Sequence, residues 1–185
     1  TQSYLYEIIC VLNNTTDNSK QIINSLSIKD LSIIDLGIIE NIGNTKGLAV
    51  REGVLRSTGS WALMMDADNA TEISELTKLL EYKEDFDIII GSRRTKESVI
   101  ENPQPLIRVF LGFCANILIQ TTLVFGCFDT QCGFKLFRRN IVNKLFGRMI
   151  TSGWGFDIEI LAKARAYGID IKEVGIIWRE VEGSH

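Results

Sequence analysis

The stretch Trp61-Ala-Leu-Met-Met-Asp-Ala-Asp-Asn-Ala-Thr71 decides the fold. Its apolar part, residues 61–65, stops at two carboxylates, Asp66 and Asp68. A short apolar run bounded by turn residues predicts a buried strand of a parallel sheet. The carboxyl end of such a strand lies at the edge where open α/β sheets bind ligands. Two carboxylates in one turn can face a hard cation, so Asp66 and Asp68 are candidate ligands of Mg²⁺ or Mn²⁺. The alternative is an ordinary polar turn.

Strand-like and helix-like segments alternate on both sides of this stretch. The predicted strands are residues 6–12, 31–36, 61–65, 86–90 and 169–178. The predicted helices are residues 17–26, 47–57, 73–82 and 140–146, and a last helix opened by residues 153–157 that runs to about residue 167. This alternation at short spacing is typical of an α/β fold with a mostly parallel sheet flanked by helices. The length of 185 residues suits a single domain, residues 1–185, with a core of its own.

Composition excludes two classes of function. The formal net charge is -3, and no basic run alternates with aromatic residues, so nucleic acid is not an expected partner. Zinc is not expected either, because the cysteines form no Cys-x-x-Cys pair and the only histidine is His185. The simpler interpretation is that the cysteines are free thiols in a reducing compartment. They are Cys10, Cys114, Cys127 and Cys132.

One segment, residues 109–128, contains no charged side chain. Its length is sufficient to cross a bilayer, which is one interpretation. Four polar residues interrupt it, namely Asn116, Gln120, Thr121 and Thr122. We therefore predict an amphipathic helix or helix pair that lies partly in the core and partly against a membrane surface.

Several further motifs stand in a fixed order after the central stretch. They are Gly91-Ser-Arg93, Asp129-Thr-Gln-Cys-Gly-Phe-Lys135-Leu-Phe, Trp154-Gly-Phe-Asp157-Ile-Glu159 and Trp178-Arg-Glu180-Val-Glu-Gly-Ser184. Together with Asp66-Ala-Asp68-Asn-Ala-Thr71, their order and spacing resemble the dolichyl-phosphate β-glucosyltransferases, which are inverting enzymes of glycosyltransferase family 2. Asn44-Thr-Lys46-Gly47 resembles the Gly-Lys-Gly loop of that family. The seven residues from Asp129 to Lys135 carry the most specific part of the resemblance.

This resemblance implies a GT-A type, Rossmann-like fold and a hexosyltransferase. The expected reaction is transfer of glucose from UDP-glucose to dolichyl or another polyprenyl phosphate, with inversion and with Mg²⁺ or Mn²⁺ as cofactor. The expected location is the cytoplasmic face of the endoplasmic reticulum membrane, with the membrane surface as a partner and no nucleic acid. Two alternatives remain open: a dolichyl-phosphate mannosyltransferase that uses GDP-mannose, and a non-catalytic relative that binds nucleotide or lipid phosphate.

The resemblance also assigns candidate site residues. Asp66 and Asp68 match the metal-binding pair. The catalytic candidates are Asp129, Arg93 and Lys135. The substrate-binding candidates are Asn13, Lys46, Asp66, Gln131, Trp154 and Asp157. Trp154 and Trp178 have packing against the core as an alternative role.

The chemistry of the acceptor favours cations over a strong base. A phosphate monoester carries a charge near -2 at neutral pH, so its oxygen is already a competent nucleophile. Positioning and charge compensation should then carry more of the catalysis. Arg93, Arg94, Lys135 and Arg138 lie in or beside the motifs, although Arg94 and Arg138 also suit a solvated rim.

The N-terminal part departs from the family pattern. Members usually begin with two βα units, the second ending in Asp-Asp-Gly-Ser-x-Asp, whereas this chain has room for one unit before Asn44. If that unit is the second, Leu12 and Asn13 replace the two acids. We therefore expect a missing or degenerate N-terminal βα unit, a chain truncated at this end, and weakened contacts to uracil and ribose.

Overall fold

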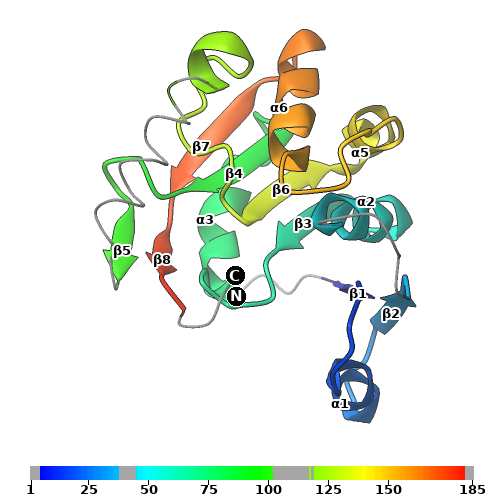
Figure 1. The fold of residues 1–185 in the computed structure, drawn as a ribbon. Helices are drawn as coiled ribbons and strands as arrows, with labels where there is room; N and C mark the ends of the chain where they lie inside the picture. Colours follow the sequence, from blue (N-terminus) through cyan, green and yellow to red (C-terminus); the bar gives the residue numbers. More distant parts are fainter. Residues whose placement is uncertain (1–4, 38–44, 102–116, 118, 182–185) are drawn as a thin grey trace.

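The computed structural model describes residues 5–37, 45–101, 117 and 119–181. The strands in this part of the chain are β1 (Ile8–Leu12), β2 (Leu31–Asp35), β3 (Trp61–Met65), β4 (Ile88–Ser92), β5 (Val99–Glu101), β6 (Phe134–Arg138), β7 (Ile171–Gly175) and β8 (Ile177–Arg179). The helices are α1 (Ser19–Ser25), α2 (Lys46–Arg56), the 3₁₀ turn η1 (Ile73–Glu75), α3 (Leu76–Leu80), α5 (Arg139–Phe146) and α6 (Phe156–Ala166). Figure 1 shows their arrangement.

The central sheet has the strand order β3-β6-β4-β7 (Figure 1). β4 pairs in parallel with β7, and β6 runs antiparallel to both β3 and β4. β3, β4 and β7 therefore share one direction, as predicted, and a reversed strand lies among them. The sequence did not predict β6. All five residues of β4 and the first four of β6 are buried, which is expected for strands covered on both faces.

Two hydrophobic clusters cover the two faces of this sheet. Because side chains alternate along a strand, Phe137 of β6 packs with α2, α5 and α6, whereas Phe134 and Leu136 pack with Leu79 of α3. The neighbouring β4 divides in the same way, with Ile89 on the α3 side. The sheet is therefore the middle layer of an α/β sandwich.

The segment β1-α1-β2 precedes α2 and forms a parallel two-stranded sheet of its own. It docks on the body of the domain through the carboxylate of Glu7, which accepts hydrogen bonds from the backbone N–H groups of Thr58 and Gly59. Val11 also packs against α2 beside Gly53. Among the described residues, one βα unit thus stands before α2, as the sequence predicted.

The last predicted strand, residues 169–178, is two strands, so that prediction was wrong. β7 pairs with β4, whereas β8 pairs in parallel with β5 in a separate sheet. Gly175 lies at the break and has no room for a side chain, because a Cβ there would lie 2.6 Å from Oγ1 of Thr95. The loop that follows β4 therefore packs tightly on the end of β7 and redirects the chain.

The uncharged segment is described only in part, because residues 109–116 and 118 lie outside the described residues. In its described end, Val124 and Cys127 are fully buried, whereas Leu123, Phe125 and Phe128 are exposed. This end is therefore partly core and partly surface, whereas its contact with a membrane stays a prediction. Within the described part of the chain, the helices are too short or too polar to cross a bilayer.

Candidate active site

The predicted site residues gather at one edge of the central sheet. Asp66 directly follows β3 and Arg93 directly follows β4. Because β6 is reversed, its first residue, Phe134, lies opposite Met65 at the end of β3. The loop of residues 129–133, which leads into β6, therefore reaches the same edge as the carboxyl ends of the parallel strands.

Asp66 is held in close contact with this loop. Its backbone N–H donates to the carbonyl of Gly133 over 2.9 Å. A Cβ at position 133 would lie 2.0 Å from Oδ2 of Asp66, so only glycine leaves room for the carboxylate. Oδ1 of Asp66 lies 2.8 Å from Nζ of Lys46, which also lies 4.4 Å from the ring centroid of Trp154. The structure thus brings together three of the predicted substrate-binding residues, Asp66, Lys46 and Trp154.

Asp68 lies in the turn that follows Asp66. Its Oδ1 accepts a hydrogen bond from the backbone N–H of Ala70 over 3.0 Å, and Asn69 between them has a left-handed φ of 56°. No cluster of three or more acidic, cysteine or histidine side chains forms a closed metal cage among the described residues. Two carboxylates still fit Mg²⁺ or Mn²⁺, because such ions usually keep water and phosphate oxygens as ligands. The contact between the Lys46 ammonium and Asp66 shows that this carboxylate already attracts a positive charge.

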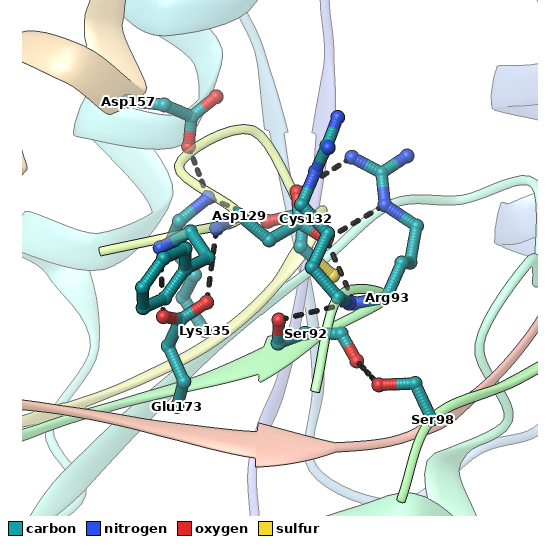
Figure 2. Close-up of polar contacts among 10 residues, drawn as sticks. Ser92, Arg93, Ser98, Asp129, Cys132, Lys135, Asp157 and Glu173 are labelled. Carbon is teal, nitrogen blue, oxygen red and sulfur yellow. Dashed lines mark hydrogen bonds and ion pairs between the residues drawn. The ribbon is translucent and has the colours of Figure 1, made fainter. Parts of the chain in front are cut away.

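Arg93 and Asp129 form a two-pronged ion pair (Figure 2). Nε and Nη2 of Arg93 lie 2.8 Å and 2.7 Å from the carboxylate oxygens, and the backbone N–H of Arg93 donates to Oδ2 over 2.8 Å. Burial alone would raise the pKa of Asp129, but the hydrogen bonds and charge of Arg93 outweigh it, so the pKa is lowered. Asp129 is therefore ionised, and the guanidinium is oriented. Arg93 also lies over the ring of Trp178.

Glu173 belongs to the site, and sequence reasoning missed it. Its carboxylate, projecting from β7, accepts hydrogen bonds from the backbone N–H groups of Phe128 and Asp129 over 2.7 Å and 2.9 Å (Figure 2). Glu173 thus holds the start of the loop of residues 129–133, called the motif loop below, against the sheet. The available signal was weak, because Glu173 stands in the strand sequence Ile171-Lys-Glu-Val-Gly175 beside a second charged residue, Lys172.

Lys135 is buried beneath the site rather than exposed in it. Only 1% of its side chain is accessible, and Nζ lies 2.5 Å from both the Asp157 carboxylate and the carbonyl of Cys132 (Figure 2). Burial raises the pKa of Asp157, and the Lys135 ammonium offsets part of that rise. Burial also raises the pKa of the Cys132 thiol to about 12, so it stays protonated. Lys135 and Asp157 therefore join the loop to α6.

The remaining candidates lie in different places. The side chain of Asn13 accepts a hydrogen bond from Oγ1 of Thr45, directly before Lys46, over 2.7 Å. Gln131 is exposed in the motif loop, and Arg94 is exposed after β4. Arg138 does not join the site, because β6 carries it to the opposite edge. There it pairs with Asp87 over 2.6 Å and lies over the ring of Trp61.

Comparison with known proteins identifies the family of this site. Residues 1–146 match the family described as Glycosyl transferase family 2. The chain belongs to glycosyl transferase family 2. It is 36% identical, over 98% of its length and 57% of the relative's, to a dolichyl-phosphate beta-glucosyltransferase of Dictyostelium discoideum. It is 34% identical to the Saccharomyces cerevisiae protein of the same name, over 97% of this chain and 58% of that protein. The chain therefore spans somewhat more than half the length of these relatives.

Solved structures support the fold. Glucosyl-3-phosphoglycerate synthase from Mycobacterium tuberculosis, in complex with phosphoglyceric acid, matches with a TM-score of 0.60 and 14% identity. The match covers 97% of this chain and 73% of that one. The same enzyme in complex with Mn²⁺, UDP-glucose and glycerol 3-phosphate matches with a TM-score of 0.54 and 15% identity, over the same shares of the two chains. The predicted membership of glycosyltransferase family 2 and the predicted GT-A type α/β fold are confirmed.

Proposed function

We propose that this chain forms the glycosyltransferase domain of an enzyme that transfers glucose from UDP-glucose to dolichyl or another polyprenyl phosphate, with inversion. One observation carries the proposal: an acidic pair and an oriented arginine lie at the same sheet edge. Asp66 and Asp68 suit a metal-bound diphosphate, and Arg93 suits a second phosphate. The names of the relatives agree with glucose as the transferred sugar and dolichyl phosphate as the acceptor.

Asp66 and Asp68 are the residues that would hold Mg²⁺ or Mn²⁺ on the donor side. When bound, such an ion neutralises the charge that develops on the departing diphosphate. Lys46 adds a second positive charge at the same place, and Trp154 offers an exposed ring beside it. Asn13 supports this group indirectly, because its contact with Thr45 holds the start of α2.

Arg93 is the proposed acceptor-phosphate ligand. Arginine binds phosphate through its fork of N–H donors, and Arg93 keeps 26% of its side chain exposed. Asp129 is only 3% exposed, and its lowered pKa makes it a poor proton acceptor at neutral pH. The acceptor phosphate is already an ionised nucleophile and needs no strong base. We therefore assign Asp129 to orienting Arg93 rather than to proton transfer.

The lipid part of the acceptor would approach over the apolar surface next to Asp129. Phe125 is 84% exposed, and Leu123 and Phe128 are each 54% exposed. Exposed apolar residues that precede Asp129, the partner of Arg93, suit a substrate whose charged head is attached to a long hydrocarbon chain. This surface supports our proposal that the protein acts at a membrane. We propose the cytoplasmic face of the endoplasmic reticulum as that membrane, by resemblance to the family alone.

The deciding experiment is an assay of sugar transfer with the full-length protein in detergent. Radiolabelled UDP-glucose and GDP-mannose are offered separately with dolichyl phosphate, each with Mn²⁺, with Mg²⁺ or with a chelator. We expect glucose transfer that depends on the metal and is lost in Asp68→Ala, together with a β-linked product. Preference for GDP-mannose would establish the mannosyltransferase alternative. Ligand binding without turnover would establish a non-catalytic relative.

A further inference from the structure

The cation that faces Asp66 in this structure comes from the chain itself. Nζ of Lys46 lies 2.8 Å from Oδ1 of Asp66 and 4.4 Å from the ring centroid of Trp154. The same carboxylate is the one that the proposed function assigns to a divalent metal. An ammonium in hydrogen-bond contact with a carboxylate oxygen occupies part of the space that a metal ion on that oxygen would need.

The backbone around Lys46 is held in place. A Cβ on the next residue, Gly47, would lie 2.7 Å from the carbonyl oxygen of Thr151 and 2.8 Å from Cβ of Phe156. The backbone N–H of Leu48 donates to the carbonyl of Ser152 over 3.1 Å. The start of α2 is thus packed against the loop before α6. Any movement of the positive charge must come from the flexible four-carbon side chain of Lys46.

The contact between Lys46 and Asp66 is easy to exchange. The side chains are 25% and 33% exposed, and ion pairs this accessible to water contribute little net stability. A divalent ion placed on Asp66 would meet the ammonium as a like charge a few ångströms away, which is unfavourable. A bound nucleotide diphosphate would remove this repulsion, because its oxygens can accept hydrogen bonds from the lysine ammonium and can also ligate the metal.

We propose that Lys46 is an exchangeable counter-ion, which occupies Asp66 when no donor is bound and moves to the donor diphosphate when a metal takes its place. This inference rests on the proposed function for the donor side. It predicts that the open pair of carboxylates binds a metal only weakly without a nucleotide. It also makes binding of the metal and of the diphosphate cooperative, because each ligand favours the same position of the lysine.

The test uses Mn²⁺ alone, followed by UDP in the presence of Mn²⁺. Free Mn²⁺ is measured by electron paramagnetic resonance, and UDP binding by titration calorimetry. Lys46→Met should bind Mn²⁺ alone about 5- to 10-fold more tightly than the wild type, because a neighbouring like charge has been removed. The same variant should bind UDP with Mn²⁺ about 10-fold more weakly. A lysine that serves only to stabilise the fold would not change the two affinities in opposite directions.

Two matched variants serve as controls. Lys46→Arg keeps the positive charge, so its affinity for Mn²⁺ without nucleotide should stay as low as that of the wild type. Lys144→Met removes an equal charge from a lysine that lies over Tyr167, and should leave both affinities unchanged. Lys46→Gln replaces Lys46→Met if the latter does not fold, as judged by thermal unfolding.

The possible failures are distinguishable. If the wild type binds UDP with Mn²⁺ but Lys46→Met and Lys46→Gln gain no affinity for Mn²⁺ alone, the exchange is wrong and the proposed function stands. If UDP and Mn²⁺ do not bind the wild type together, or bind Asp66→Asn equally well, the proposed donor site itself is wrong.

Discussion

Gly133→Ala is expected to disable the donor site while leaving the fold nearly intact. Gly133 is the point at which the motif loop touches Asp66, and a new Cβ would lie 2.0 Å from Oδ2 and 2.9 Å from Oδ1. The backbone itself accepts alanine, because Gly133 does not have a positive φ. The clash therefore falls on the Asp66 side chain, which supplies all three of the nearest atoms, and we expect this side chain to move.

The size of that movement follows from the contact distance. A carbon and an oxygen normally approach to about 3.3 Å, so the Asp66 carboxylate must move by more than about 1 Å. The move breaks its 2.8 Å contact with Lys46, and the loss of such an accessible ion pair costs about 1 kcal/mol or less. A misplacement of about 1 Å in a reacting complex can lower the rate about 100-fold. We therefore expect a large loss of transfer and a small loss of stability.

The assay combines glucose transfer, Mn²⁺-dependent UDP binding and denaturant unfolding. Gly155→Ala is the matched control, because a Cβ there would make an ordinary 3.4 Å contact with Cγ2 of Thr151. If Gly133→Ala acts through Asp66, adding Asp66→Asn should cause little further loss, since the two changes remove the same interaction. Wild-type transfer and UDP affinity in Gly133→Ala would refute the assignment of Asp66 to the donor site.

Three further predictions concern other parts of the domain. Asp129→Asn should lower the free energy of unfolding by about 3 kcal/mol, because it leaves Arg93 without its buried charged partner. The same variant should also reduce transfer. Wild-type stability in a denaturant titration would contradict this prediction. The carboxylate of Glu159, in α6, accepts hydrogen bonds from the backbone N–H groups of Ile150 and Thr151. Burial raises its pKa, but these bonds and Lys163 outweigh burial and lower the pKa to about 2. Its contribution is therefore complete above pH 4.5 and is lost as the pH falls toward 2. Glu159→Gln should accordingly cost about 2 kcal/mol at pH 7, allowing for solvent screening, and the cost should shrink in acid denaturation curves. Phe125→Ser should reduce the fraction of protein that floats with phospholipid vesicles. An unchanged fraction would show that this surface does not bind the membrane.

The sequence predicted those elements whose signal is local. The apolar run before Asp66 became β3, and the alternating segments around it became α2, α5 and α6 close to their predicted bounds. Each is a short apolar or amphipathic segment that ends at glycine or polar residues, so neighbouring residues suffice to recognise it. The positions of Asp66 and Arg93 after strands followed from the same signals.

The parts that were missed depend on distant partners. β6 carries Lys135 in the middle of a buried strand, and a lysine there argues against a strand until its partner is known. That partner, Asp157, lies on a helix that follows later in the chain. The role of Glu173 likewise depends on backbone N–H groups of the motif loop more than forty residues earlier. Sequence spacing cannot reveal such pairings when one chain is read alone.

The direction of β6 decides which cations of the motif reach the site. Arg138 stands three residues after Lys135, yet a strand advances about 3.3 Å per residue, so Arg138 lies at the far end of β6 beside Asp87. Lys135 remains near the site edge, but its position in the pleat directs it under the surface toward α6. The accessible positive charges come instead from Lys46 at the start of α2 and from Arg93 at the end of β4. Both follow from the directions of the strands and helices, since the carboxyl ends of parallel strands and the amino end of α2 meet at one edge. A residue that follows the motif in the sequence is therefore expected at the site only as far as the first residue of β6.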